Sequence, residues 1–169
     1  MIWWVILIEA VVFALLFTGI VFLGCIKGKY NASTIHNYPP DIQEEYFKTH
    51  ERVDVSSKSI KVIITKSCGI LMFIAIFTLC SYLAGAKTFL EGFLLGLGLM
   101  VWLGLYDTLF LDWVLFANLK MFRLQGTEHM DKEYHQKWFH FKGLLFPGMI
   151  FGVIVAAFVG LFTYLISLI

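Results

Sequence analysis

Two aspartates, Asp107 and Asp112, stand at the end of a hydrophobic stretch long enough to cross a bilayer. An ionised carboxylate at mid-membrane costs about 2.5–3.5 kcal/mol on insertion scales, so each one needs a proton, a partner or water. Such a group can bind a cation, a proton or a lipid head group. The alternative is a structural ion pair with Lys66 or Lys142 that holds the helices together.

Asp107 follows Gly104 by three residues and therefore lies on the helix face that carries small residues every fourth position. Asp112 is five residues further on, about 140° round an α-helix. We therefore expect the two carboxylates to share a proton only if the helix is distorted between them. Other members of the small-residue face are Gly92 and Gly96.

A second group of polar residues, His140 and Lys142, begins the last hydrophobic stretch and lies at about the depth of the two aspartates. A histidine there changes charge near neutral pH, and a lysine either holds a phosphate or extends to the head groups. We expect a site in which Asp107 is the central ligand. Asp112 and His140 shape or protonate it, Lys142 sets its charge, and Trp113 lies beside it.

A metal site is a second hypothesis for the same region. His129, Glu133, Gln136 and His140 are spaced by four, three and four residues, so they share one face of a helix. Histidine and glutamate one turn apart can bind a transition metal. The wet side of any interfacial helix has the same polar pattern, so the sequence leaves the cofactor open.

Glu9 lies in the outer half of the first hydrophobic stretch. It is protonated, paired across the bundle, or part of an outer access route to a binding site. Glu91 follows Lys87 by four residues, which predicts a simple surface ion pair.

Composition and hydropathy predict an all-α, four-helix bundle in a membrane. The hydrophobic fraction of 59% exceeds that of soluble domains. Four stretches pass the length test for a spanning helix, forming a single transmembrane domain over residues 1–169. They cover about 2–26, 62–84, 90–113 and 144–168, and loops at about 27–61 and 119–142 follow the first and third.

The basic residues predict the orientation of these spans. Every lysine and arginine except Lys87 lies in or beside these two loops. The positive-inside rule then puts both loops in the cytoplasm and both termini outside, in an inner membrane. Met130, Tyr134, Trp138 and Phe141 recur at helical spacing, which predicts an interfacial helix from about 128 to 142.

Small residues also indicate how the helices pack. Gly148, Gly152, Ala156 and Gly160 are each four apart in the last span. Such stripes permit close helix approach within the bundle or in a homo-oligomer. The lipid bilayer is therefore the expected partner, and a net charge of +1 gives no indication of a nucleic-acid partner.

The layout Asp107-x4-Asp112-Trp113, then Gly126-Thr-Glu128, then His140-Phe-Lys-Gly143 resembles a group of small four-helix bacterial membrane proteins. The resemblance covers only the segment from the end of the third span to the start of the fourth. It implies a bacterial cytoplasmic membrane and carries over no activity.

Three functions remain compatible with the sequence. The first is binding or transport of a small solute, ion or lipid through an inner-facing polar site. The second is a membrane enzyme acting on a lipid or lipid-linked substrate at the inner leaflet, although no catalytic motif of the common families is present. The third is an assembly or accessory subunit.

Overall fold

The computed structural model describes residues 1–26, 35–52 and 60–169, and within these ranges the chain is helical with no β-strand. The side chain of Lys66, one of the two partners considered for Asp107, lies outside the described part. The chain divides into two compact units. Unit 1 comprises Met1–Phe13, Val55–Gly104 and Leu145–Ile169, and unit 2 comprises Ala14–Asp54 and Leu105–Leu144.

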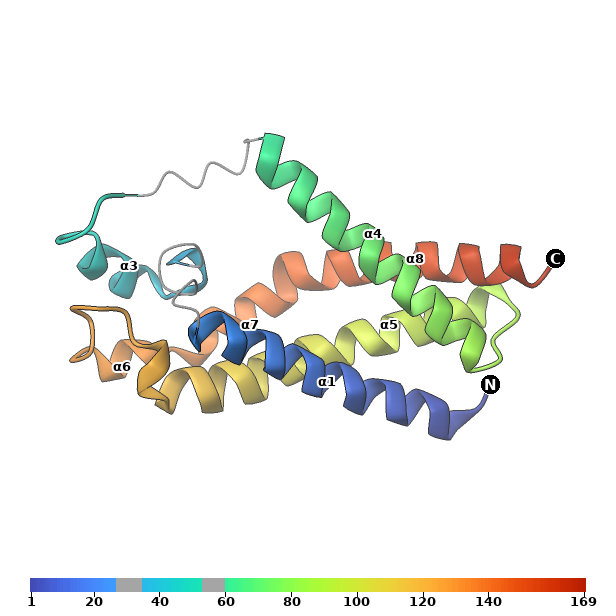
Figure 1. Cartoon of the computed structure of the whole chain (residues 1–169), viewed down its shortest axis with the longest axis horizontal. Coiled ribbons are helices and arrows are strands. Elements are labelled where there is room, and N and C mark those ends of the chain that lie inside the picture. Colours follow the sequence, from blue (N-terminus) through green and yellow to red (C-terminus); the bar gives the residue numbers. More distant parts are fainter. Residues whose placement is uncertain (27–34, 53–59) are drawn as a thin grey trace. The chain divides into compact units, whose positions relative to one another are not determined.

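The long helices coincide with the four predicted spans. They are α1 (Trp3–Ile26), α4 (Ile60–Leu83), α5 (Phe89–Tyr106) and α8 (Met149–Ile166) (Figure 1). Three helical stretches are long and apolar enough to cross a membrane: Trp3–Cys25, Phe89–Phe116 and Asp131–Ile166. In α4, the described apolar part is the shorter Ser67–Leu83.

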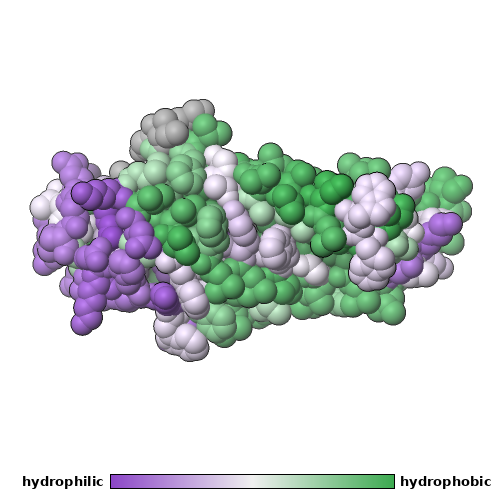
Figure 2. Space-filling view, turned by 90° about the horizontal axis from the view of Figure 1, so that it is seen from below, coloured by the Kyte–Doolittle hydropathy of each residue, from purple (hydrophilic) through white to green (hydrophobic). Residues whose placement is uncertain are grey.

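The exposed surface of these helices is hydrophobic. Leu7 in α1, Leu71 in α4 and Leu90 in α5 are each more than half exposed. In Figure 2 hydrophobic side chains cover the long helices, whereas hydrophilic side chains gather on the segments that contain the short ones. This is the surface pattern of helices that contact lipid.

Unit 1 is held together by close helix contacts at glycines. A Cβ placed on Gly92 would lie 2.5 Å from the Thr163 hydroxyl, and one on Gly160 would lie 2.7 Å from the Phe89 carbonyl oxygen. The predicted small-residue stripes of α5 and α8 therefore face each other within this unit. Close approach of this kind strengthens van der Waals packing where lipid provides no hydrophobic drive.

The start of α5 differs from the prediction in one detail. Glu91 forms no ion pair with the Lys87 ammonium; its carboxylate accepts hydrogen bonds from the backbone N–H groups of Lys87 and Thr88. The Thr88 hydroxyl in turn accepts the N–H of Glu91. This reciprocal arrangement is a capping box, which satisfies N–H groups that the first helical turn leaves unbonded.

The last predicted span is interrupted near its start. A π-helical segment, η4 (Leu144–Gly148), precedes α8, and Phe146 within it has extended backbone angles. Pro147 explains the break, because proline lacks an N–H donor and disfavours helical angles in the residue before it.

Unit 2 contains a core that the sequence did not predict. The two polar loops fold into short elements, among them η1 (Ile35–Asn37), α3 (Pro40–Tyr46) and η3 (Lys120–Phe122). Their apolar side chains form one buried cluster around Tyr38, Ile42, Phe122 and Tyr134. Tyr38 also donates a hydrogen bond to the Phe122 carbonyl, which joins the first loop to the second.

The single interfacial helix predicted over 128–142 is wrong. The structure has two shorter helices, α6 (Asp131–Tyr134) and α7 (Lys137–Gly143). Tyr134 turns into the core and is 1% exposed, whereas Trp138 is 61% exposed, so they do not share one apolar face. The burial of Tyr134 in the core favours the break, and the Lys137 carbonyl at the start of α7 accepts the Trp113 indole N–H.

The helix that carries the two aspartates is distorted between them. Residues Asp107–Phe116 form a π-helix, η2, which continues α5. At its end the Ala117 N–H donates to the Asp112 carbonyl, five residues back. In this wider turn, residues five apart come round to the same face, and such segments are frequent at functional sites. The distortion needed to bring Asp107 and Asp112 together is therefore present.

Candidate functional site

The centre of the site is a contact between Asp112 in η2 and His140 in α7. The His140 Nδ1 atom lies 3.0 Å from Asp112 Oδ2. The histidine side chain is 7% exposed and the aspartate side chain 23% exposed. These two helices pack against each other within unit 2, so the contact belongs to the interior of one compact unit.

His140 is enclosed by aromatic rings. The rings of Phe116 and Phe139 lie edge-on to the imidazole, each with its centroid 5.2 Å away. The second imidazole nitrogen, Nε2, is buried and has no hydrogen-bond partner among the described residues. A histidine whose one nitrogen is fixed by a carboxylate and whose other nitrogen is unpartnered can take up or release a proton there.

Asp107 is the third member of the site. It is partly buried, and its carboxyl lies close enough to Asp112 and His140 to interact electrostatically with both. Among the described side chains, no lysine or arginine forms an ion pair with it. Two carboxyl groups and one imidazole therefore lie within electrostatic range of one another.

The structure places Lys142 and Trp113 beside this cluster rather than in it. The Lys142 ammonium lies 5.9 Å from the centre of the Trp138 ring. The Lys137 ammonium lies 5.2 Å from the centre of the Trp113 ring. Both are cation–π contacts at the partly exposed side of α7. Of the two lysines considered for Asp107, Lys142 thus has a different partner.

A metal-binding group is not formed by the described residues. No three of their histidine, cysteine, aspartate or glutamate side chains lie close enough together to hold a metal ion. The hypothesis that joined His129, Glu133 and His140 assumed one continuous helix. The break between α6 and α7 separates those positions, and His140 instead contacts Asp112.

Glu9 belongs to unit 1 and lies apart from this site in the chain. Both of its carboxylate oxygens are buried, and the Cys80 thiol of α4 is the neighbouring group. No described lysine, arginine or histidine forms an ion pair with it.

Sequence reasoning missed Arg123. Its side chain is 7% exposed, and one guanidinium nitrogen donates to both the Ala117 carbonyl and the Asp131 carboxylate at 2.7 Å. The guanidinium also lies 3.9 Å from the centre of the Tyr134 ring. The signal was present as an arginine among apolar residues, Met121-Phe-Arg-Leu124, but basic residues in a loop are usually solvated.

Comparisons with protein-family models, with curated proteins and with solved structures find no match to this chain. The geometry of the side chains therefore carries the functional conclusion.

Proposed function

We propose that the protein is a multi-pass membrane protein that moves a proton or a small cation by way of the Asp107–Asp112–His140 cluster. The observation that carries the proposal is the 3.0 Å contact between His140 Nδ1 and Asp112 Oδ2, in a π-helical segment that also contains Asp107. Asp112 holds the imidazole, and Asp107 adds a second carboxylate that no described basic side chain neutralises.

The proposed chemistry is reversible protonation. When the imidazole is charged, it forms an ion pair with Asp112. When it loses a proton, the contact becomes a hydrogen bond and the net charge of the cluster falls by one. The uncharged imidazole leaves two neighbouring carboxyl groups without a described basic partner, which favours uptake of a proton or a small cation.

The proposed setting is a bacterial cytoplasmic membrane. In this proposal the chain has four spans with both termini outside; the hydrophobic stretches and the basic loops support it. The cluster would then face the cytoplasm near the inner leaflet, and the small-residue faces would pack within a single transmembrane bundle or a homo-oligomer. The hydrophobic exposed surface of α1, α4, α5 and α8 supports this setting.

Proton or cation flux into liposomes containing the purified protein tests the proposal. We expect flux in the wild type and a loss of at least about tenfold in Asp107→Asn and in His140→Gln. The first change removes a carboxyl group that can take up a proton, and the second removes the imidazole that contacts Asp112. Asp131→Asn is the matched control, since Asp131 is an aspartate of the same unit with a 75% exposed side chain. Flux that survives Asp107→Asn unchanged would remove the proposed role of the cluster.

A further inference from the structure

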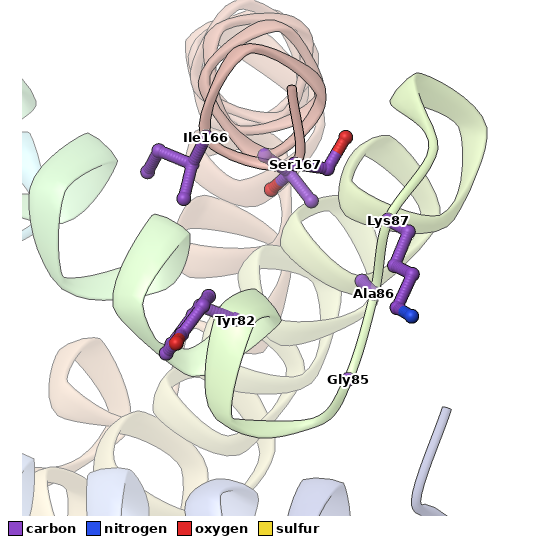
Figure 3. A pocket seen from close by; sticks show the side chains of 7 residues that line it. Tyr82, Gly85, Ala86, Lys87, Ile166 and Ser167 are labelled. Carbon is purple, nitrogen blue, oxygen red and sulfur yellow. The ribbon is translucent and has the colours of Figure 1, made fainter. Parts of the chain in front are cut away.

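Unit 1 contains a cavity of about 180 Å³ between the segment that joins α4 to α5 and the end of α8 (Figure 3). The Lys87 ammonium is directed away from this cavity, and the Ser167 hydroxyl already donates to the Tyr164 carbonyl. The cavity therefore presents no described charged side chain to a ligand. A titratable group that is enclosed in the same unit, and that the proposed function does not use, is the Glu9 carboxyl of α1.

The Glu9 carboxyl lies within the apolar part of α1. The residue as a whole is partly exposed, but both of its carboxylate oxygens are buried. Glu9 follows Trp3, the first residue of the helix, by six positions, which is about 9 Å along the helix axis. Trp3 and Trp4 are exposed aromatic residues of the kind that lie at a membrane interface. The carboxyl group is therefore set back from the polar end of the helix.

Two contacts hold this part of α1 against α4. The Ile2 backbone N–H donates to the Ala84 carbonyl at 2.8 Å. The rings of Phe13 and Phe77 meet edge to face, with their centroids 5.3 Å apart. Glu9 lies between these two contacts along α1, so α4 covers its carboxyl group.

The neighbours of the carboxyl group carry no positive charge. The Cys80 thiol, from a residue that is 7% exposed, interacts with Glu9 from α4. From α5, the Trp102 indole N–H donates to the carbonyl of Ala10, the next residue of α1. No described lysine, arginine or histidine forms an ion pair with Glu9. A thiol is a weak, uncharged donor and does not neutralise an ionised carboxylate.

A proton removes this deficit more readily than a metal ion does. An ionised carboxylate without a partner is unfavourable in an apolar environment. A hard cation needs several oxygen ligands, whereas the neighbouring group here is a sulfur atom. A proton needs no such ligands and makes the carboxyl group neutral. We propose that Glu9 is a second proton-binding site, whose neutral carboxylic acid lies against the Cys80 thiol of α4. This site belongs to unit 1 and does not rest on the function proposed for the cluster in unit 2.

Infrared spectroscopy of the purified protein in detergent tests this assignment. At neutral pH we expect the wild type to show the carbonyl stretching band of a protonated carboxyl group, and Glu9→Gln to lose the Glu9 contribution to it. Glu91→Gln is the matched control in the same unit. The Glu91 carboxylate accepts backbone N–H groups, which favour the ionised form, so this variant should keep the band.

Two further measurements keep the test independent of how well Glu9→Gln folds. Glutamate labelled with a heavy carbon isotope in its side-chain carboxyl group should shift the band of the wild type, whereas a protonated aspartate of the other unit would not respond to this label. Cys80→Ala should keep the band but shift its frequency, because the thiol that neighbours the carboxyl group is lost.

Either of two results would overturn the assignment. One is a protonated-carboxyl band that is the same in the wild type and in Glu9→Gln. The other is a wild-type band that glutamate labelling does not shift, which would show that Glu9 is ionised. A band that keeps its frequency in Cys80→Ala would remove the thiol from the proposed site.

Discussion

The two units treat their buried polar groups differently. In unit 1 the hydroxyls of Thr78 and Ser81 are buried and have no partner among the described residues, and glycines bring the helices together. In unit 2 the Thr127 hydroxyl, which is 0% exposed, donates to the Leu124 carbonyl and also contacts the Tyr134 hydroxyl at 2.7 Å.

The two units are therefore stabilised by different kinds of contact. Unit 1 derives its contacts from shape, because its helices meet where a Cβ would not fit. Unit 2 derives them from an aromatic core and from directed polar contacts, including the one between Asp112 and His140. Directed polar contacts fix the orientation of titratable groups, which is what a proton-binding site needs.

The largest expected effect is on the glycine contacts of unit 1. Gly160→Ala should lower the free energy of unfolding by an amount near the upper end of the range of about 1–3 kcal/mol. The added Cβ would collide with the backbone oxygen of Phe89, and the backbone cannot easily move aside. Gly98→Ala is the control, since a Cβ there has nothing within 4 Å. Thermal unfolding in detergent measures both, and equal midpoints would contradict the packing account.

The next effect concerns the buried arginine of unit 2. Arg123→Ala should lose about 1.5–3 kcal/mol, because it removes charge-assisted hydrogen bonds and the contact with the Tyr134 ring. Asp131→Ala should lose less than about 1 kcal/mol, since solvent screens its 75% exposed carboxylate. Denaturant unfolding of the two variants compares them. A larger loss for Asp131→Ala would show that the ion pair, and not the buried guanidinium, stabilises the unit.

A pair of threonines sharpens the comparison between the units. Thr127→Val should lose about 1–2 kcal/mol, since its hydroxyl makes two contacts in the buried core. Thr78→Val should be neutral or slightly stabilising, because the hydroxyl that it removes has no partner among the described residues. The thermal midpoints of both variants test this expectation. Equal decreases in the two midpoints would contradict the proposed difference between the units.

The smallest effect is expected at the surface pair of α3. The Lys48 ammonium, 2.6 Å from the Glu45 carboxylate, lowers the pKa of Glu45 below its ordinary value of 4.5. A lowered carboxyl pKa adds stability above the ordinary pKa, and this stability is lost as the pH falls through the folded-state pKa. Because Lys48 is exposed and Glu45 is only partly buried, solvent screens the pair, and Lys48→Ala should leave the thermal midpoint unchanged at neutral pH.

The same variant has a direct readout. An NMR titration should show the Glu45 pKa rising toward its ordinary value in Lys48→Ala, and an unchanged titration would mean that the pair does not persist in solution.

The helices of unit 1 were predictable because their signals are local. Long apolar runs and glycines spaced by four identify both the elements and their contact faces, and the predicted bounds differ from those of α1 and α4 by one or two residues. The start of α8 shows the limit of this reasoning. Pro147 lies in an uncharged apolar stretch, and hydropathy alone does not predict that the helix is interrupted there.

The folding of unit 2 was less predictable because it depends on contacts between distant segments. The Tyr38 hydroxyl donates a hydrogen bond to the Phe122 carbonyl, and no local sequence pattern predicts this contact. The same tertiary packing breaks the expected helix between Tyr134 and Lys137.

The sequence selects candidates for the site but does not predict how they are arranged. Asp107, Asp112 and His140 were selected by residue type and depth. The π-helical turn that contains both aspartates carries no clear sequence signal, since neither proline nor glycine lies within Asp107–Phe116.

The measurement that tests the central claim most directly is a double-variant cycle on flux in liposomes with Asp107→Asn and His140→Gln. If the cluster acts as one unit, either change removes flux and the double variant is no worse than either single variant. Independent losses that multiply in the double variant, or single variants that keep wild-type flux, would contradict the claim that Asp107, Asp112 and His140 form one functional site.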